Sequence, residues 1–541
     1  MLRLFLAVGL FTLVETMMAK SARAEPPLPT LEVRATSLNR LAEQLPTFGE
    51  MIGQREAANQ MAGLVQAFTD PQKGLEGFDP ARPVGMYATV TPQVINSPVI
   101  VMLPVQNEKA VLALMTEKLG LKPEPQDGKR YQVALPNLPL PVYFRFAHRY
   151  LYVTVMNPEG IEPRQLITPE AFFPKSFPGL FRADLHLDRI PNEVTTMLFG
   201  QFELRTEEAK QEPRLGKSPA KRKLWQLNLD ALADLVQTLI RDGKSVSFQV
   251  GLNTKSEELV ATWSLTGKPG SPLAQALASP RDPSRVYGMT RAHPQAAVTA
   301  YLNLGIPRAY LPAIADWYDL AAEDAVDNAK DSDKLGSRMV MNAFAPTVKS
   351  GRIDAGFQIF GPNDDERYTI LGGFRASQGK SIEDTARLIL STAPKDEFTV
   401  KLDQHKQRGI NFHELRPLKK SGDFDRFAHP AIWLSTAESF FGVEWGGDGQ
   451  HVRVAAKATP ADAPVAEIRL EINRILPLIV PELSKKTTEA LTKEILGASP
   501  TEDATTVQLQ VRTGTALTVE ARVKAKAVRL LTAVDEAKKQ Q

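Results

Sequence analysis

The segment SVSFQVGLNTKSEELVATWSL, from Ser245 to Leu265, decides the fold class predicted for this chain. Apolar residues occupy alternate positions from Val246 to Leu252 and again from Leu259 to Leu265. In a β-strand, such alternation places the apolar side chains on one face and the polar side chains on the other. The polar stretch 253–258 joins the two runs, so the segment predicts a half-buried antiparallel hairpin.

Helical patterns flank this hairpin on both sides. Leucine, valine and isoleucine recur at intervals of three and four residues from Trp225 to Asp242, as one face of an amphipathic helix requires. Gly243 follows, at a position where helix ends favour glycine. After the hairpin, Ser271 can cap a short helix that runs through Leu277. The predicted order is therefore long helix, hairpin, short helix.

The C-terminal end of the chain repeats this order. We expect a helical tract from Ala463 to Leu496, a hairpin from Val507 to Val523, and a final charged helix. Upstream elements also occur in pairs. These are two predicted strand pairs, 142–155 and 431–456, and two predicted helices, Glu108 to Leu119 and Ser381 to Leu390.

Together these patterns predict an α+β fold of two related modules, each an antiparallel sheet with one face covered by long amphipathic helices. Antiparallel hairpins argue against a parallel βαβ sheet and its nucleotide-binding crevice. We expect four segments: 1–24 as a signal peptide, 25–75 as an N-terminal helical segment, 76–280 as the first module and 281–541 as the second. The boundary falls near Ser279 to Pro283, where two prolines interrupt the chain.

The first residues have the pattern of an export signal. Leu4 to Val14 is an apolar run, and Ala22 and Ala24 form the A-x-A pattern that precedes a cleavage site. The run is shorter than the roughly 20 apolar residues that span a bilayer. We therefore expect cleavage near Ala24 and a periplasmic or secreted protein, with an uncleaved N-terminal anchor as the alternative. No later segment is apolar enough to predict a transmembrane span.

Composition excludes several classes of site. The chain contains no cysteine, which excludes disulfides, thiolate metal ligands and cysteine nucleophiles. Without residues 1–24 the formal net charge is about +1, so nothing electrostatic predicts nucleic-acid binding. The basic run Arg214 to Lys223 follows an acidic patch and contains glycine and proline, which is typical of a solvated loop.

The common catalytic motifs are also missing from the sequence. There is no G-x-S-x-G elbow, no phosphate-binding P-loop, no G-x-G-x-x-G and no H-E-x-x-H. His413-Glu414 lacks the second histidine of a zinc helix, and the neighbours Phe412 and Leu415 indicate a strand. We therefore predict no catalytic residue and no cofactor.

One stretch, FRADLHLDRI from Phe181 to Ile190, has residues that could carry out chemistry. On a strand, Asp184, His186 and Asp188 would share one face and could act as metal ligands. Arg182 would lie on the same face, which favours charge pairing over a cation site. The two interpretations are a metal site and a solvated strand face with Asp-His and Asp-Arg contacts.

Two further clusters have a functional and a structural interpretation. The oxygen-rich run Asn363 to Glu366 could bind calcium, but its place at a hairpin tip is typical of a solvated turn. A phenylalanine cluster could dock a partner or a lipid, or could pin a proline-containing loop to the core. Its members are Phe172, Phe173, Phe177 and Phe181.

Three segments resemble exported proteins of unknown function from planctomycete-type bacteria. They are GLEGFDPARPVGMYATV (Gly74 to Val90), FRADLHLDRIP, and GKPGSPLAQALA (Gly267 to Ala278). The resemblance implies an envelope or secreted location and carries over no catalytic residue.

We therefore expect a non-enzymatic exported envelope protein that binds a partner protein or an apolar, lipid-like ligand. The alternative is a metal-dependent hydrolase that uses Asp184, His186 and Asp188.

Overall fold

The computed structural model describes a defined part of the chain: residues 28–51, 54, 56–57, 59–63, 76–127, 129–135, 138–174, 179–211, 218–291, 295–407, 409–418, 426–429, 431–480, 483, 485–497, 501 and 503–540. The predicted signal peptide, residues 1–24, lies outside this part. Phe177 and residues 214–217 of the basic run also lie outside it. Residues 219–223 of that run begin a helix, so the prediction of a solvated loop is wrong for them.

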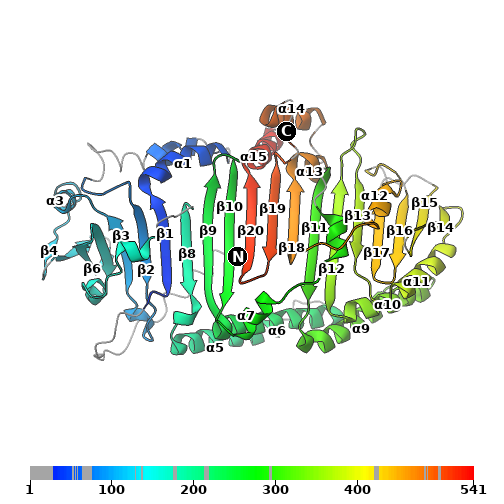
Figure 1. Cartoon of the computed structure of the whole chain (residues 1–541), viewed down its shortest axis with the longest axis horizontal. Coiled ribbons are helices and arrows are strands. Elements are labelled where there is room, and N and C mark those ends of the chain that lie inside the picture. Colours follow the sequence, from blue (N-terminus) through cyan, green and yellow to red (C-terminus); the bar gives the residue numbers. More distant parts are fainter. Residues whose placement is uncertain are drawn as a thin grey trace. The chain divides into compact units, whose positions relative to one another are not determined.

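The chain divides into two compact units. Unit 1 comprises residues 1–203 and 236–275, and unit 2 comprises residues 204–235 and 276–541. Each unit contains an antiparallel sheet, which agrees with the predicted α+β class (Figure 1).

The strands of unit 1 among the described residues are β1 (Leu31–Ser37), β2 (Pro83–Ala88), β3 (Val99–Pro104), β4 (Glu124–Pro125), β5 (Arg130–Leu135), β6 (Leu138–Ala147), β7 (Tyr150–Val155), β8 (Phe181–His186), β9 (Gly243–Asn253) and β10 (Glu258–Gly267). Hydrogen-bonded neighbours follow the order β4, β5, β6, β7, β3, β2, β1, β8, β9, β10, and each pair is antiparallel.

The described strands of unit 2 are β11 (Ala296–Gly305), β12 (Arg352–Phe360), β13 (Thr369–Phe374), β14 (Phe398–Gln407), β15 (Ile410–Pro417), β16 (Ile432–Ala437), β17 (Phe440–Trp445), β18 (Ala466–Glu471), β19 (Thr506–Arg512) and β20 (Leu517–Lys524). Their order is β14, β15, β16, β17, β13, β12, β11, β18, β19, β20. Adding ten to each strand number of unit 1 therefore reproduces the order of unit 2.

The α-helices from the first half of the chain are α1 (Leu38–Met51), α3 (Glu108–Ala113), α4 (Pro169–Phe172), α5 (Asn192–Lys210), α6 (Pro219–Asp242) and α7 (Pro272–Ala278). Those from the second half are α8 (Arg285–Thr290), α9 (Leu311–Asp327), α10 (Lys334–Lys349), α11 (Gly379–Ser391), α12 (Gln450–Ala455), α13 (Ile472–Ile479), α14 (Lys485–Leu496) and α15 (Ala525–Gln540).

The structure confirms the hairpin that opened the sequence analysis. It forms β9 and β10, and Val246 pairs with Leu265 as the alternation requires. Ser271 caps α7, because its Oγ accepts a hydrogen bond from the backbone N–H of Ala274 at 3.2 Å.

Three sequence predictions need correction. Residues 466–471 form strand β18 and not the start of a long helix. Residues 450–455 form helix α12 and not a return strand, because the partner of β16 is β17. Residues 31–37 form β1 within the sheet of unit 1, whereas the sequence pattern predicts a helical segment over 25–75. In each case a short amphipathic stretch fits two periodicities, and pairing with distant strands decides between them.

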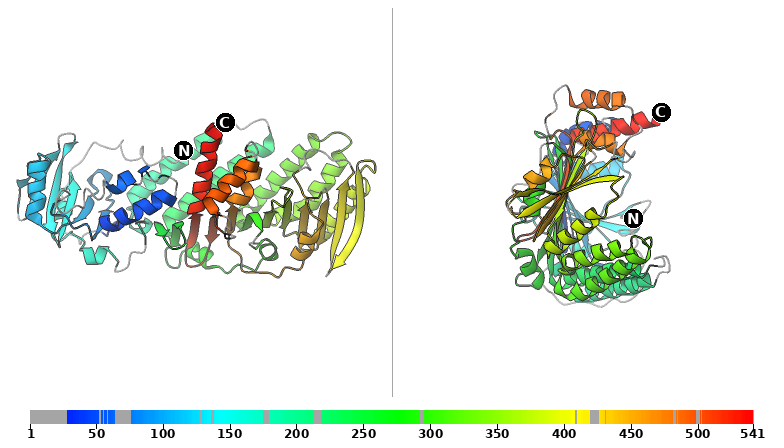
Figure 2. Two further views of the ribbon diagram at one scale, coloured as in Figure 1. Left: turned by 90° about the horizontal axis from the view of Figure 1, so that it is seen from above. Right: turned by 90° about the vertical axis from the view of Figure 1, so that its right-hand side faces the viewer.

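In unit 2, helices pack against both faces of the sheet. Val286 and Met289 of α8 and Val452 of α12 share a core with Tyr301 and Trp433 on one face. The opposite face packs against α13 and α15, through residues such as Ile475 and Leu530. The prediction of helices over one face only is therefore too simple for this unit. Figure 2 shows helices above and below the strand ends.

Candidate functional site

The structure separates the three residues of the predicted metal site. Asp184 and His186 lie on β8, but the strand ends at His186. Asp188 follows in a 3₁₀ turn, Leu187–Arg189, and its side chain is exposed. The expectation that all three side chains share one strand face is therefore wrong for Asp188.

The carboxylate of Asp184 is already paired with two arginines. Nη1 of Arg34, on the neighbouring strand β1, donates to Asp184 Oδ2 at 2.7 Å. Nε of Arg182 donates to both carboxylate oxygens at 3.0 and 2.9 Å, and Nη2 donates to Oδ1 at 2.9 Å. Hydrogen bonding to Asp184 raises the pKa of Arg182 further above its ordinary value. Two guanidinium groups thus supply the positive charge that a metal ion would bring.

His186 pairs with a glutamate and not with Asp184. Its Nε2 lies 3.3 Å from Oε1 of Glu32, which is paired with Arg34 and also accepts a hydrogen bond from Nη1 of Arg189. We call this group, Glu32, Arg34, Arg182, Asp184, His186 and Arg189, the ionic cluster of unit 1. Its donors and acceptors match one another, which favours the structural interpretation over a metal site.

A second acidic group with a histidine occurs in unit 2, and no motif in the sequence predicts it. Ligand atoms of Glu383 on α11, Asp403 on β14 and His413 on β15 lie within 4.8 Å of one another. Asp403 sits in an irregularity of the β14–β15 pairing with φ 53°, a conformation that is strained for a non-glycine residue. Such strain is common where a fold holds a functional group in place.

The hydrogen bonds in this group do not fit a metal ion. Nδ1 of His413 accepts a hydrogen bond from the backbone N–H of Asp403 at 3.1 Å, so the neutral imidazole carries its proton on Nε2. Arg387 bridges the two carboxylates: Nε donates to Glu383 at 2.9 Å, and Nη1 donates to Asp403 at 2.7 Å. These bonds lower the pKa of Asp403 below its ordinary value. The arginine thus occupies the place that a cation would take.

The two other sequence candidates have structural surroundings. Asn363 stabilises an exposed turn, because its Oδ1 accepts hydrogen bonds from the backbone N–H groups of Asp365 and Arg367 at 3.1 and 2.8 Å. Phe172 and Phe173 pack edge to face with ring centroids 4.9 Å apart, and Phe172 is buried in the core of unit 1.

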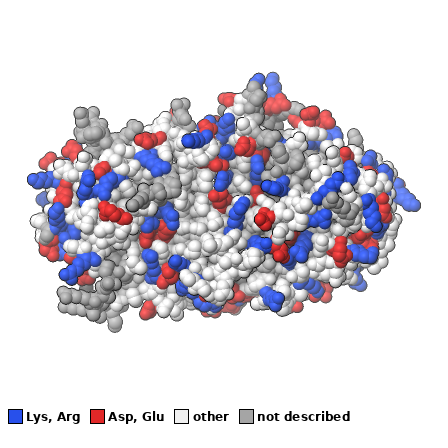
Figure 3. Space-filling view, viewed as in Figure 1, with Lys and Arg blue, Asp and Glu red and all other residues white. Residues whose placement is uncertain are grey.

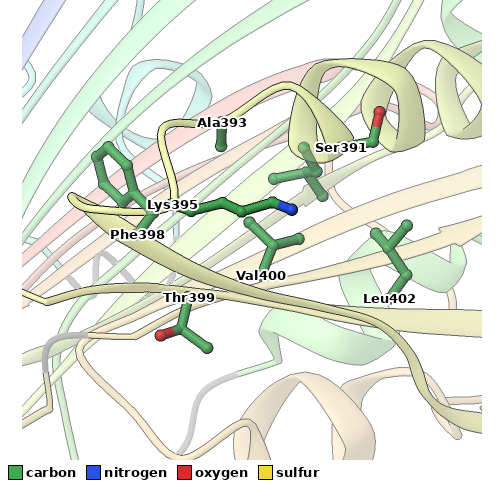
Figure 4. Close-up of a pocket in the computed structure, with 8 residues that line it drawn as sticks. Ser391, Ala393, Lys395, Phe398, Thr399, Val400 and Leu402 are labelled. Carbon is green, nitrogen blue, oxygen red and sulfur yellow. The ribbon is translucent and has the colours of Figure 1, made fainter.

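Two pockets in unit 2 could hold small molecules. A pocket of about 380 Å³ lies between the end of α11 and β14. In Figure 4, Lys395 extends across it above Val400, and the other labelled residues offer hydroxyl or apolar groups. A larger pocket of about 630 Å³ lies beside the start of α13, and its lining includes two arginines, Arg367 and Arg474, and a histidine, His451.

One face of the sheet in unit 2 carries an extended apolar surface among the described residues. Directly paired residues of an antiparallel sheet point to the same face, so the strand registers define rows that run across the strands. We define the first row as Val507, Leu470, Val298, Ile359, Ile370, Trp445 and Ile432. The middle row is Leu509, Ile468, Ala300, Phe357, Gly372, Val443 and Leu434. The third row is Val511, Ala466, Leu302, Ala355, Phe374, Phe441 and Thr436.

Helices cover parts of the first and third rows but leave much of the middle row open. Val298 of the first row is buried against α13 and α15. In the third row, Phe374 and Phe441 pack against Phe344 of α10, with ring centroids 5.7 and 6.3 Å apart. Three side chains of the middle row stay accessible: Ile468 is 45% exposed, Phe357 41% and Leu509 39%. A sheet interior with this exposure is unusual, because such residues normally pack beneath a covering layer.

Unit 1 has a corresponding row. Its members, in register across the strands, are Trp263, Phe248, Ala183, Val33, Met86, Val101, Val153 and Phe144. Trp263 is 41% exposed, and its ring lies 4.8 Å from that of Phe248. The row is as free of polar side chains as the middle row of unit 2.

Charged side chains, unlike the apolar side chains of these rows, are not grouped by kind. Figure 3 shows lysine and arginine intermixed with aspartate and glutamate on the face in view.

In the part of the chain that the structure describes, no helix combines the length and the apolarity needed to cross a bilayer. Comparisons of the chain with protein-family models, curated proteins and solved structures find no match.

Proposed function

We propose that this protein binds the hydrocarbon chain of a lipid on the open row of its sheet and does not transform it chemically. The observation that carries the proposal is the middle row of unit 2: three accessible apolar side chains with no polar side chain between them. A surface of this kind offers burial of apolar area and no hydrogen bonds, which is the chemistry of an acyl chain.

The width of the row favours a hydrocarbon chain over a protein partner. The first and third rows are four residues apart along each strand, or about 13 Å, and helices pack over both. A docked helix has a diameter of about 10–12 Å with its side chains and would contact these helices. A docked strand would need unpaired backbone N–H and C=O groups at a sheet edge. Each strand along the row is hydrogen-bonded to a neighbouring strand on both sides, so the row offers no such edge.

The length of the row suits an acyl chain as well. The row crosses seven strands from Leu509 to Leu434, which corresponds to six spacings of about 4.8 Å, or about 29 Å. Half the thickness of a bilayer core, the span of one lipid tail, is about 15 Å. The row is therefore long enough for one tail with room at either end.

The test is lipid binding by the purified protein. We expect lipid to co-purify and to be detected by native mass spectrometry, and a fluorescent C16 fatty acid to bind. Phe357→Gln and Ile468→Gln should each weaken binding of the fatty acid, roughly 30-fold for Phe357, because about 2 kcal/mol of apolar burial is lost.

Leu335→Gln provides a matched control. Leu335 is 72% exposed on α10 and lies outside the three rows, so its substitution should leave binding unchanged. Equal weakening by Leu335→Gln would sink the proposal, and so would the absence of any fatty-acid binding. Retention of a folded partner protein in place of lipid would favour the protein-binding alternative.

We also propose that units 1 and 2 descend from one duplicated module. The matching strand order supports this, and so does an ungapped alignment of LHLDRI (Leu185 to Ile190) with LEINRI (Leu470 to Ile475). The next strands align in the same register, SVSFQV from Ser245 with TVQLQV from Thr506. If homologous sequences are compared and the two halves are no more similar than unrelated sheets, the proposal is wrong.

An exported location remains part of the proposal. It is supported by the composition of residues 1–24, and it suits a carrier that takes lipid between membranes. Fractionation of the source cells followed by N-terminal sequencing tests it, since a mature protein beginning near Glu25 is expected. A cytoplasmic protein that begins at Met1 would contradict it.

A further inference from the structure

The pocket of about 630 Å³ in unit 2 lies where three segments converge: the β12–β13 connection, the first turn of α13, and His451 of α12. Its volume is within the range of small-molecule sites. The described side chains around it include two arginines, Arg367 and Arg474, and a single carboxylate, Asp364.

Neither arginine has a partner among the described residues. No ion pair or side-chain hydrogen bond joins Arg367 or Arg474 to another described group, and both are half-buried. Elsewhere in unit 2 half-buried arginines are paired: Arg387 with two carboxylates, and Arg469 with Glu471 at 2.9 Å. An unpaired guanidinium in a concave site is a ready anion ligand, because the cost of removing it partly from water is not yet offset.

The backbone around both arginines is fixed by hydrogen bonds. The hydroxyl of Tyr368 donates to the carbonyl oxygen of Arg474 at 3.0 Å, so the two arginine segments are joined. Oδ1 of Asn363 accepts from the N–H of Arg367 at 2.8 Å. Oδ1 of Asn473 accepts from Thr505 at 2.7 Å, which leaves the amide NH₂ of Asn473 as an additional donor in the pocket.

His451 closes one side of the pocket. Its ring stacks on Phe360 with centroids 4.3 Å apart and planes 11° from parallel. Burial lowers the pKa of His451 below its ordinary value, so the imidazole is neutral at pH 7 and adds no charge. With Arg367, Arg474 and Asp364, the pocket has a net charge of about +1.

Unit 1 provides an internal comparison for Arg474. In the alignment of LHLDRI with LEINRI, Arg189 occupies the position of Arg474. Arg189 is held by the carbonyl oxygen of Pro29 at 2.7 Å and by Glu32 at 3.3 Å. In the register of β1 and β8, Glu32 lies opposite Asp184. The corresponding register partners in unit 2 are Thr299 and Arg469. Since a threonine replaces the glutamate, Arg474 loses its internal partner and is available to a ligand.

We infer that this pocket binds the phosphate group of an anionic ligand through Arg367 and Arg474. Two planar guanidinium forks and an amide donor match the several acceptor oxygens of a phosphate, whereas a carboxylate is satisfied by a single fork. The inference does not depend on lipid binding at the middle row. The phosphate could belong to a lipid headgroup or to a small water-soluble molecule.

The test uses isothermal titration of the full-length protein with two probes, inorganic phosphate and dihexanoyl phosphatidic acid below its micelle concentration. We expect saturable binding of at least one probe. Arg474→Gln and Arg367→Gln should each weaken it at least tenfold, and the double variant should abolish it. Comparable binding of both probes indicates recognition of phosphate alone, and binding of phosphatidic acid only indicates a lipid headgroup. Both outcomes support the inference.

Arg338→Gln is the control, because Arg338 is exposed on α10 and lies outside the pocket. It removes the same charge and should leave the affinity unchanged. Circular dichroism melting of each variant confirms folding, since neither pocket arginine forms a side-chain bond within the described residues. Absence of binding by both probes overturns the inference, as does equal weakening by Arg338→Gln.

Discussion

The two units place different polar residues at the same positions of the same strand arrangement. In unit 1, Arg34 on β1 lies opposite Arg182 on β8 in the strand register, and both belong to the ionic cluster. The corresponding pair in unit 2 is Tyr301 with Glu467. There, Tyr301 donates to Asp354 at 3.0 Å, and Tyr287 donates to Glu467 at 3.1 Å, so neutral donors replace the guanidinium groups.

The apolar faces of the two sheets, by contrast, have the same character. Rows in register across both sheets contain almost only aliphatic and aromatic side chains. The comparison indicates that the apolar rows specify the sheet, because a polar residue there would lose its hydration without gaining a partner. The opposite face tolerates any polar network whose donors and acceptors are satisfied.

The largest expected effect is at the centre of the ionic cluster. Asp184→Ala removes the carboxylate that Arg34, whose side chain is 13% exposed, shares with Arg182, and leaves Glu32 as the remaining carboxylate partner of Arg34. Removing one partner of a buried ion pair costs about 3–5 kcal/mol. We expect urea denaturation to show a loss of this size, and hydrogen exchange to place it in β1 and β8.

The counterpart in unit 2 is the comparison for this prediction. Arg469→Ala leaves the carboxylate of Glu471, whose side chain is 2% exposed, with Thr506 as its remaining described side-chain donor at 2.6 Å. A buried carboxylate again loses its guanidinium, so we expect a cost of about 3–5 kcal/mol here as well. A loss below about 1 kcal/mol for either variant would contradict the view that the polar network of that unit depends on its charges.

The next effect concerns the tyrosine network of unit 2. Tyr301→Phe removes the hydroxyl that donates to Asp354, a buried carboxylate that retains Ser284 at 2.7 Å as its other side-chain donor. Loss of one buried donor costs about 1–3 kcal/mol. The measurement is the free energy of unfolding. A change below a few tenths of a kcal/mol would show that the network does not stabilise unit 2.

Local patterns made the hairpins predictable, because alternation within ten residues is enough to indicate a strand and its turn. β18 was missed because its sequence AEIRLE precedes α13 directly, and polar residues at 467 and 471 also fit helical spacing. The group of Glu383, Asp403 and His413 could not be predicted, since residues 20 and 10 positions apart meet only when α11 packs on β14 and β15. Strand order is likewise a long-range property that no local period encodes.

A smaller effect is the response of unit 2 to acid. Burial lowers the pKa of His413 below its ordinary value of 6.5, and the same cause lowers the pKa of His429. As pH falls through 6.5 the unfolded chain binds these protons before the folded chain does, so stability present above pH 6.5 is lost below it. We expect the urea midpoint to fall between pH 7 and 5, and His413→Gln to reduce that slope.

Adding Zn²⁺ to the protein tests whether the group of Glu383, Asp403 and His413 binds a metal, whose release at low pH would also destabilise unit 2. Since Arg387 already bridges Glu383 and Asp403, added Zn²⁺ should leave the melting temperature of the wild-type protein unchanged at pH 7. Stabilisation by Zn²⁺ that His413→Gln abolishes would show that the group is a metal site after all.

The smallest expected effect compares two turns at the same place in the two units. The β6–β7 turn contains His148 and Arg149 with φ of 50° and 60°, whereas Glu438 and Ser439 of the β16–β17 turn are not among the described residues with positive φ. Glycine relieves the strain of the left-handed conformation, which costs about 1 kcal/mol for other residues. Arg149→Gly should therefore stabilise the protein by about 0.5–1 kcal/mol, because the ion pair it removes, 3.9 Å from Asp79, is exposed and weak. Ser439→Gly should be neutral or destabilising, since glycine only adds freedom to the unfolded chain there. If both substitutions stabilise by the same amount, the two turns share one conformation and the difference between the units does not extend to this hairpin.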